Sequence, residues 1–131
     1  MNLPLSRYGT LQRHTDSVTA LAFAGDTHLL SGGKDGQLLV WRVKDWECVH
    51  TLLGHKPGPV TSVAVHPSGK VALSTSRDRS LRLWDLVNGS AATRLAVESC
   101  RELGQACWSP GGGLFAVVGD GKPTLLYNFT L

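Results

Sequence analysis

Residues 60–86, VTSVAVHPSGKVALSTSRDRSLRLWDL, decide the fold of this chain. Three short apolar runs lie within this stretch, at residues 60–65, 71–75 and 81–86. The turn-forming sequences HPSG and RDR separate these runs. Each run is too short for an ordinary helix, and its β-branched residues suit a pleated, buried surface. The stretch therefore predicts a meander of three strands.

The same pattern recurs on either side of this stretch. Trp41, Trp84 and Tyr127 each end a comparable apolar run, and each lies 43 residues after the one before. Two further pairs keep this spacing: Ser31 with Ser74, and Asp35 with Asp78. A tandem repeat with a period near 40 residues predicts one supersecondary unit per copy, each stacked on its neighbours.

The repeat divides the chain into four parts. We expect an N-terminal segment at residues 1–13, a first repeat at 14–53, a second at 54–96, and a degenerate, incomplete third repeat at 97–131. Strands are predicted at 18–23, 28–32, 37–43 and 47–53, then at 60–65, 71–75, 80–86 and 91–96, and finally at 103–108, 114–118 and 124–129. Residues 5–13 are expected to add one short strand before the first repeat.

Four short strands per copy, with a Gly-His…Trp-Asp signature, resemble the WD40 family. Gly54-His55 and Trp84-Asp85 match that signature literally, whereas Arg13-His14 and Trp41-Arg42 match it loosely. The resemblance covers residues 14–129. It implies an all-β fold, a fragment of a β-propeller with about three four-stranded antiparallel blades. We expect no closed ring, because propellers typically have four to eight blades.

The resemblance also assigns two structural tetrads. They consist of His14, Ser31, Asp35 and Trp41 in the first repeat, and of His55, Ser74, Asp78 and Trp84 in the second. In such a tetrad, the turn aspartate orients the histidine, which meets the strand serine, and the serine receives the indole N–H. The third repeat has Val117, Gly121 and Tyr127 at the serine, aspartate and tryptophan positions, so we expect its blade to be the loosest.

Histidine, serine and aspartate are also the residue types of a nucleophilic triad. An enzyme needs one such set, whereas this chain carries the set twice at repeat-related positions, and it has no G-x-S-x-G elbow. We therefore interpret both sets as structural and expect no catalytic residue, cofactor, metal site or small-molecule substrate. Hydrolysis at His14, Ser31 and Asp35 remains the weakest hypothesis.

Composition sets further bounds. The net charge is +3 and the pI is near 9, which permits contact with RNA or an acidic protein without requiring it. The residues before Leu5 do not resemble a signal peptide, and no apolar run has the length of a membrane-spanning helix. We expect an intracellular protein with three reduced thiols, of which Cys107 lies in a strand facing the core.

Partner binding is predicted on loops 14–17, 33–36, 56–59 and 76–79. The candidate residues are Lys34, Trp46, Lys56, Arg77, Arg79 and Arg82. Trp46 either caps the edge of its blade or offers an aromatic anchor to a partner. The basic residues either form an ordinary solvated hairpin or, with Lys70, a patch for an acidic segment or ribosomal RNA.

Four sequence runs narrow the resemblance within the WD40 family. They are DWEC at 45–48, HPSGKVALS at 66–74, LRLWDLV at 81–87 and WSP at 108–110. These runs are similar to a nucleolar branch that interacts with the p21-activated kinase. That likeness implies a non-enzymatic scaffold of the nucleus and nucleolus, which acts in large ribosomal subunit biogenesis and restrains the kinase. Two alternatives stay open: an RNA-contacting assembly factor, and an inactive fragment of a longer propeller.

Overall fold

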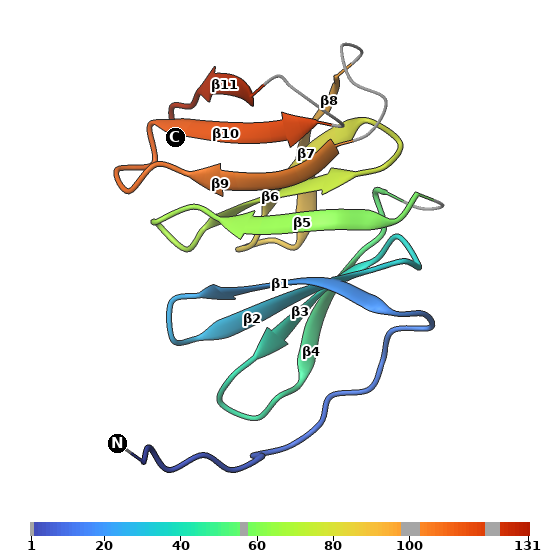
Figure 1. Ribbon diagram of the computed structural model, residues 1–131, viewed down its shortest axis with the longest axis vertical. Coiled ribbons are helices and arrows are strands. Elements are labelled where there is room, and N and C mark those ends of the chain that lie inside the picture. Colours follow the sequence, from blue (N-terminus) through green and yellow to red (C-terminus); the bar gives the residue numbers. More distant parts are fainter. Residues whose placement is uncertain (1, 56–57, 98–102, 120–123) are drawn as a thin grey trace.

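A computed structural model describes residues 2–55, 58–97, 103–119 and 124–131 (Figure 1). These residues contain strands and no helix. Sheet 1 comprises β1 (Val18–Ala24), β2 (His28–Gly33), β3 (Leu38–Arg42) and β4 (Cys48–Leu52). Sheet 2 comprises β5 (Val60–Val65), β6 (Val71–Ser76), β7 (Ser80–Asp85) and β8 (Ser90–Ala96). Sheet 3 comprises β9 (Leu103–Trp108), β10 (Leu114–Gly119) and β11 (Thr124–Asn128).

Each sheet is an antiparallel meander in which neighbouring strands are also consecutive in the chain. The predicted all-β fold is confirmed, with sheets of four, four and three described strands and no closed ring. Each of these strands begins and ends within one residue of its predicted bounds. The predicted and observed bounds agree because the hairpins are short, and their turn residues fix where one strand ends and the next begins.

The sheets stack on one another in chain order, and the first strands of successive sheets lie side by side (Figure 1). The same side-chain bond joins these first strands at both contacts. The hydroxyl of Thr19 in β1 donates to the carbonyl oxygen of Val60, and the hydroxyl of Thr61 in β5 donates to that of Gly104 at 3.1 Å. Thr19 and Thr61 therefore hold equivalent places in their sheets.

Two apolar cores lie between the sheets. The core between sheets 1 and 2 contains Leu30, Leu38 and Val40 from one side and Val63, Ala72 and Trp84 from the other. The core between sheets 2 and 3 contains Leu73 and Leu81, packed with Leu103, Phe115 and Val117. Because strand side chains alternate between faces, sheet 2 contributes to both cores.

A histidine fastens the second contact at one end of the sheets. His66, in the turn after β5, hydrogen-bonds through Nε2 to the carbonyl oxygen of Gly112 at 3.1 Å. Its ring also meets that of Trp108 edge-on, with 4.8 Å between ring centroids. Sheets 2 and 3 are thus joined by a polar contact as well as by apolar packing.

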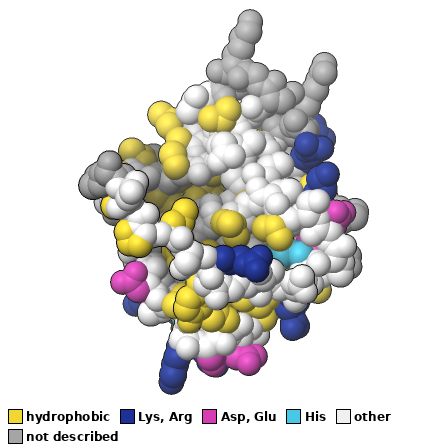
Figure 2. Space-filling model, turned by 60° about the horizontal axis from the view of Figure 1, so that its bottom comes forward, with side chains coloured by type: hydrophobic (Ala, Val, Ile, Leu, Met, Phe, Trp, Pro, Cys, Tyr) yellow, Lys and Arg dark blue, Asp and Glu magenta, His cyan; other side chains and the backbone are white. Residues whose placement is uncertain are grey.

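The outer faces of the stack carry exposed apolar side chains. On sheet 1 these are Val18, Leu21 and Phe23, and on sheet 3 they are Leu114, Val118 and Leu126. Figure 2, which turns the sheet 1 end of the molecule forward, shows hydrophobic side chains gathered over that end. These six side chains are not buried against other described residues.

Two expectations are wrong. Residues 5–13 form no strand, because no described sheet edge pairs with them. Cys107 is exposed, not directed into the core. Its neighbours Ala106 and Trp108 pack against sheet 2, so alternation turns Cys107 toward the open face of sheet 3.

No helix in the described ranges has the length and apolar character needed to cross a membrane.

Candidate functional site

The first tetrad joins the segment before β1 to β2 and β3. Nε2 of His14 lies 2.7 Å from Oγ of Ser31, and Nδ1 lies 3.1 Å from a carboxylate oxygen of Asp35. The indole N–H of Trp41 donates to Oγ of Ser31 at 3.0 Å. All three bonds are satisfied when the serine hydroxyl donates to Nε2 and the histidine Nδ1–H donates to the carboxylate.

Asp35 anchors this network in the turn between β2 and β3. The backbone N–H groups of Thr15 and Gln37 also donate to its carboxylate, at 3.0 and 3.1 Å. Burial alone would raise the pKa of Asp35, but the bonds from Gln37, Thr15 and His14 outweigh it and hold the pKa below the usual value. The ionised carboxylate thus fixes the position of the loop that precedes β1.

The second tetrad has the same residue types with one additional member. Nε2 of His55 lies 2.6 Å from Oγ of Ser74, which accepts the indole N–H of Trp84 at 2.7 Å. Nδ1 of His55 lies 2.9 Å from the hydroxyl of Ser80, and that hydroxyl donates to Asp78. The expected contact between aspartate and histidine is therefore indirect here. The reason is local: Ser80 places a hydroxyl where the first repeat has Gln37.

Burial sets the charge of this second network. It lowers the pKa of His55 to about 4, Arg82 and Arg94 act in the same direction, and the Asp78 carboxylate opposes them. Burial raises the pKa of Asp78, yet its bonds from Ser80 leave that pKa below the usual value. His55 is therefore neutral at physiological pH, as its role as acceptor from Ser74 requires.

Close packing around the Gly54-His55 turn explains its glycine. A Cβ at Gly54 would lie 2.5 Å from the tip of the Trp84 indole and 2.8 Å from the Arg82 side chain. Only glycine fits against these side chains without displacing one of them. The first repeat has Arg13 at the corresponding place, before His14.

The third repeat replaces the polar network by an aromatic stack. Val117 is buried at the serine position, and the rings of Phe115 and Tyr127 stack with 5.0 Å between centroids and 16° between planes. Gly121 lies outside the described residues. This sheet is held by apolar packing at the place where sheets 1 and 2 carry their tetrads.

The tetrads hold loops against strands and do not have the geometry of a catalytic site. Ser31 and Ser74 are 4% and 0% exposed, and each already receives an indole N–H. A nucleophile must reach a substrate, which these hydroxyls do not. Each tetrad instead ties a loop to the second and third strands of its sheet. In the described part of the chain, no group of three or more metal-ligating side chains comes together.

The loops that the tetrads support carry two of the predicted binding residues together. Lys34 follows β2 and Arg77 follows β6, at positions related by the 43-residue repeat. Both are exposed, and both line a shallow hollow of about 170 Å³ between sheets 1 and 2. Its other lining residues are Thr19, Pro59, Val60 and Thr61. We call this hollow, with Lys34 and Arg77, the basic hollow.

Arg79 and Arg82 are separated from the basic hollow. Arg79 is exposed in the turn before β7 and has a left-handed backbone, with φ of 67°. Arg82 lies within β7 opposite Arg94, and its buried Nε has no hydrogen-bond partner among the described residues. Burial and the charge of Arg94 lower the pKa of Arg82. Lys56 lies outside the described residues.

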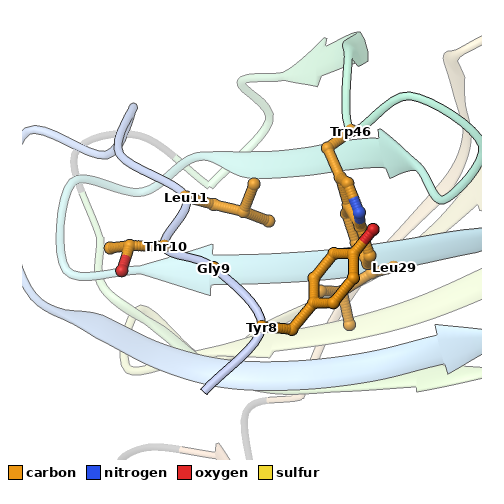
Figure 3. A pocket seen from close by; sticks show the side chains of 6 residues that line it. All are labelled: Tyr8, Gly9, Thr10, Leu11, Leu29 and Trp46. Atoms are coloured by element: carbon orange, nitrogen blue, oxygen red, sulfur yellow. The ribbon is translucent and has the colours of Figure 1, made fainter. Parts of the chain in front are cut away.

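Trp46 lies at the other end of sheet 1, in the turn between β3 and β4. Its ring centroid is 6.4 Å from that of Tyr8, and both side chains line a hollow of about 380 Å³ with Leu11 and Leu29 (Figure 3). The half-buried Trp46 ring thus meets the N-terminal segment. This hollow and the basic hollow are at opposite ends of the strands, so one small partner loop does not contact both.

Comparison with known proteins identifies the fold family. Residues 5–42 and 46–85, together more than half of the chain, match the family described as WD domain, G-beta repeat. The chain belongs to the WD40-repeat family. In this fold the tetrads hold the loops that precede the first strand of sheets 1 and 2.

Several curated WD40 relatives are similar over most of this chain. The Danio rerio protein named p21-activated protein kinase-interacting protein 1-like is 44% identical over 117 residues, which are 89% of this chain and 31% of that protein. Protein MAK11 of Saccharomyces cerevisiae is 35% identical over 137 aligned positions, which cover 92% of this chain and 33% of that protein.

A third relative matches a shorter region. Shk1 kinase-binding protein 15 of Schizosaccharomyces pombe is 41% identical over 75 residues, which are 57% of this chain and 22% of that protein. The chain therefore spans about a third or less of the length of these relatives.

Sequence reasoning missed three residues of these WD40 sites. Ser80 bridges His55 to Asp78, Arg94 faces Arg82, and Tyr8 contacts Trp46. A hydroxyl two positions after the tetrad aspartate was a readable signal for Ser80. The other two contacts depend on strand register and on the path of the N-terminal segment, for which the sequence offers no signal.

Proposed function

We propose that this chain is a non-enzymatic WD40 scaffold that binds a p21-activated kinase and restrains its activity. We further propose that it serves large ribosomal subunit biogenesis in the nucleus and nucleolus. The observation that carries the kinase proposal is the similarity, over 89% of the chain, to a protein named for its interaction with p21-activated kinase. A second relative is named as a binding protein of the Shk1 kinase.

The basic hollow is the proposed kinase contact. Its two basic residues, Lys34 and Arg77, come from adjacent blades, and the tetrads hold the turns that carry them. Paired positive charges at a fixed spacing favour an acidic segment of a partner, by speeding encounter and by fixing its register. The half-buried Pro59 between them suits an apolar partner side chain seated between the charges.

A charge-reversal experiment tests this contact. The affinity of the chain for immobilised p21-activated kinase is measured for the unaltered chain and for the double variant Lys34→Glu/Arg77→Glu. We expect the variant to bind about tenfold more weakly or worse, since two attractive charges become repulsive. The matched control is Lys44→Glu/Lys70→Glu, with the same charge change in exposed turns at the other end of the strands.

The outcomes separate the two parts of the proposal. If the unaltered chain does not bind the kinase, the partner assignment is wrong. If both double variants weaken binding equally, the contact is not at the basic hollow. Restraint is measured separately, as loss of kinase activity on a peptide substrate when the chain is saturating.

Direct RNA contact is a second candidate, favoured by the net charge of +3 and by basic side chains in adjacent turns. Binding to a ribosomal RNA fragment would then weaken steeply with salt, because each neutralised phosphate releases a counterion. A shallow dependence on salt, or equal binding of the unaltered chain and Lys34→Glu/Arg77→Glu, would exclude RNA recognition at this hollow.

The ribosomal role is tested in cell extracts. We expect the chain to co-sediment with precursors of the large ribosomal subunit, and to leave those fractions when the precursors are depleted. An even distribution over the gradient would contradict the role in ribosome biogenesis while leaving kinase binding intact.

A further inference from the structure

Two arginine side chains face each other across the last two strands of sheet 2. Arg82 in β7 lies directly opposite Arg94 in β8, so both point to the same face of the sheet. The Cβ atoms of such a pair are about 4.5–5.5 Å apart, and like charges at this spacing repel each other. In the described part of the chain, neither arginine forms an ion pair. We call these two residues the arginine pair.

Packing alone holds the Arg82 side chain in place. A Cβ at Gly54 would lie 2.8 Å from both Cδ and Nε of Arg82, so the arginine stem rests against this glycine. Nε is the one buried side-chain nitrogen or oxygen that lacks a hydrogen-bond partner among the described residues. Buried polar groups in proteins are normally hydrogen-bonded, so this exception points to a ligand. Such a ligand would meet the terminal N–H groups, which lie beyond Nε.

The carboxylate that acts on Arg82 is already engaged elsewhere. Asp78 accepts the backbone N–H of Ser80 at 2.8 Å and also the Ser80 hydroxyl. Burial lowers the pKa of Arg82, the charge of Arg94 lowers it further, and the opposing effect of Asp78 is smaller than either. The surroundings of Arg82 therefore still favour a further negative charge.

The arginine pair is accessible from outside the stack of sheets. β8 lies beside β7, all seven of its residues are exposed, and no described strand pairs with its other edge (Figure 1). Arg94 is exposed and Arg82 is half-buried. Leu53, the residue before Gly54, is 52% exposed. The pair is thus bounded by sheets 1 and 2, and neither end of the stack contributes to it.

We propose that the arginine pair binds a phosphate monoester, carried by a phosphoserine or phosphothreonine of a partner protein. A phosphate monoester has a charge of about −1.5 to −2 at pH 7 and three acceptor oxygens, so it can bridge both guanidinium groups and neutralise them. A carboxylate has one charge and two oxygens, which a single guanidinium satisfies. An RNA phosphodiester likewise has a single charge per phosphate.

The open setting favours a protein segment over a free phosphate ion. A free ion would gain only its bonds to the two guanidinium groups. A phosphorylated segment could in addition place an apolar neighbour against Leu53 and run along the unpaired edge of β8. These contacts lie on either side of the arginine pair and would hold the phosphate there.

NMR titration tests the site directly. The Nε–H signals of the ¹⁵N-labelled chain are followed while a blocked pentapeptide, Ala-Leu-phosphoserine-Leu-Ala, is added at pH 7. We expect the signals of Arg82 and Arg94 to move together, with one dissociation constant. The same pentapeptide with plain serine should move neither signal. Inorganic phosphate should move both signals but bind more weakly than the phosphopeptide; equal affinity would overturn the assignment to a protein segment and leave a site for the free ion.

Matched variants show whether the pair is responsible. Arg94→Gln removes one guanidinium from an exposed position and should weaken phosphopeptide binding by about tenfold or more. The control, Arg7→Gln, makes the same charge change at an exposed arginine of the N-terminal segment and should bind like the unaltered chain. The proposal fails if the phosphopeptide moves neither arginine signal, if the serine peptide binds equally, or if both variants weaken binding alike.

Stability supplies a second measurement. Arg94→Glu places opposite charges across β7 and β8, so we expect the melting temperature to rise by about 1–4 °C while phosphopeptide binding is lost. An unchanged or lower melting temperature would contradict the repulsion within the pair. None of these measurements involves a kinase, so their failure would leave the proposed function unaffected.

Discussion

The two tetrads use the same four residue types, yet they lie in different surroundings. His14 contacts Asp35 directly, and Trp41 lies outside both apolar cores. His55 reaches Asp78 through Ser80, and Trp84 is packed in the core between sheets 1 and 2. The motif specifies the bonds of the serine to the histidine and the tryptophan, whereas the histidine–aspartate link and the packing around the tryptophan depend on neighbouring residues. Low dielectric surroundings strengthen satisfied bonds and penalise broken ones.

The tryptophans should show the largest difference between the two sites. Trp84→Ala removes a buried indole from a core and its bond to Ser74, so we expect a loss of about 3–5 kcal/mol in the free energy of unfolding. Trp41→Ala should cost less by about 1 kcal/mol or more, because no second sheet packs on it. Urea unfolding followed by circular dichroism measures both. Equal losses would contradict the difference in packing.

The second site should also make stability depend on pH. The pKa of His55 is about 4 in the folded chain and 6.5 in the unfolded chain. The unfolded chain therefore binds the proton first as the pH falls, so stability is full above pH 6.5 and declines toward pH 4. We expect a loss of roughly 2 kcal/mol at pH 5. His55→Asn should remove this part of the decline in urea unfolding; an unchanged slope would show that other groups cause it.

Ser80 tests the bridge in the second tetrad. Ser80→Ala leaves Nδ1 of His55 without its partner in a buried site, which should reduce stability by about 1–2 kcal/mol. Gln37→Ala, at the matching position of the first tetrad, should change stability by less than about 0.5 kcal/mol, because Asp35 contacts His14 directly. Thermal unfolding of the two variants measures the difference. Similar effects would mean that the bridge contributes little.

The turns after the second strands should give the smallest effects. Gly36 and Arg79 occupy equivalent positions, and both have positive φ, 78° and 67°. Arg79→Gly should raise stability by up to about 1 kcal/mol through relief of backbone strain, whereas Gly36→Ala should lower it by about 1 kcal/mol. The melting temperatures of both variants test these two expectations. Changes of the same sign in the two variants would contradict the role of the positive φ at these positions.

The repeat made most of the fold predictable. Turn sequences such as HPSG at 66–69 mark where strands end, and the spacing from Trp41 to Trp84 and Tyr127 fixes the number of copies. The strand at 5–13 was wrong for a physical reason, since a strand needs an adjacent edge and none is described there. The prediction that Cys107 faces the core was wrong. Cys107 and its neighbours are all apolar, so the sequence does not show which of these side chains point toward sheet 2.

The site was predictable to a lesser extent. The repeat relates Lys34 to Arg77, and they do line one hollow. The repeat does not reveal that Arg82, five residues after Arg77, lies within β7 opposite Arg94 and does not line this hollow. The bridge through Ser80 depends on the reach of one carboxylate, which spacing alone does not determine. Relations between whole repeats and the repeated serine bonds are thus readable from sequence, whereas contacts that differ between the repeats require coordinates.

The most direct test of this account is exchange of the indole N–H protons, measured by NMR in deuterated buffer. If the tetrads are buried supports whose protection depends on the neighbouring sheet, the Trp84 proton should exchange as slowly as core amides. The Trp41 proton should exchange at least tenfold faster, and the Trp46 proton fastest. Exchange of the Trp84 proton at the rate of a free indole would contradict the account.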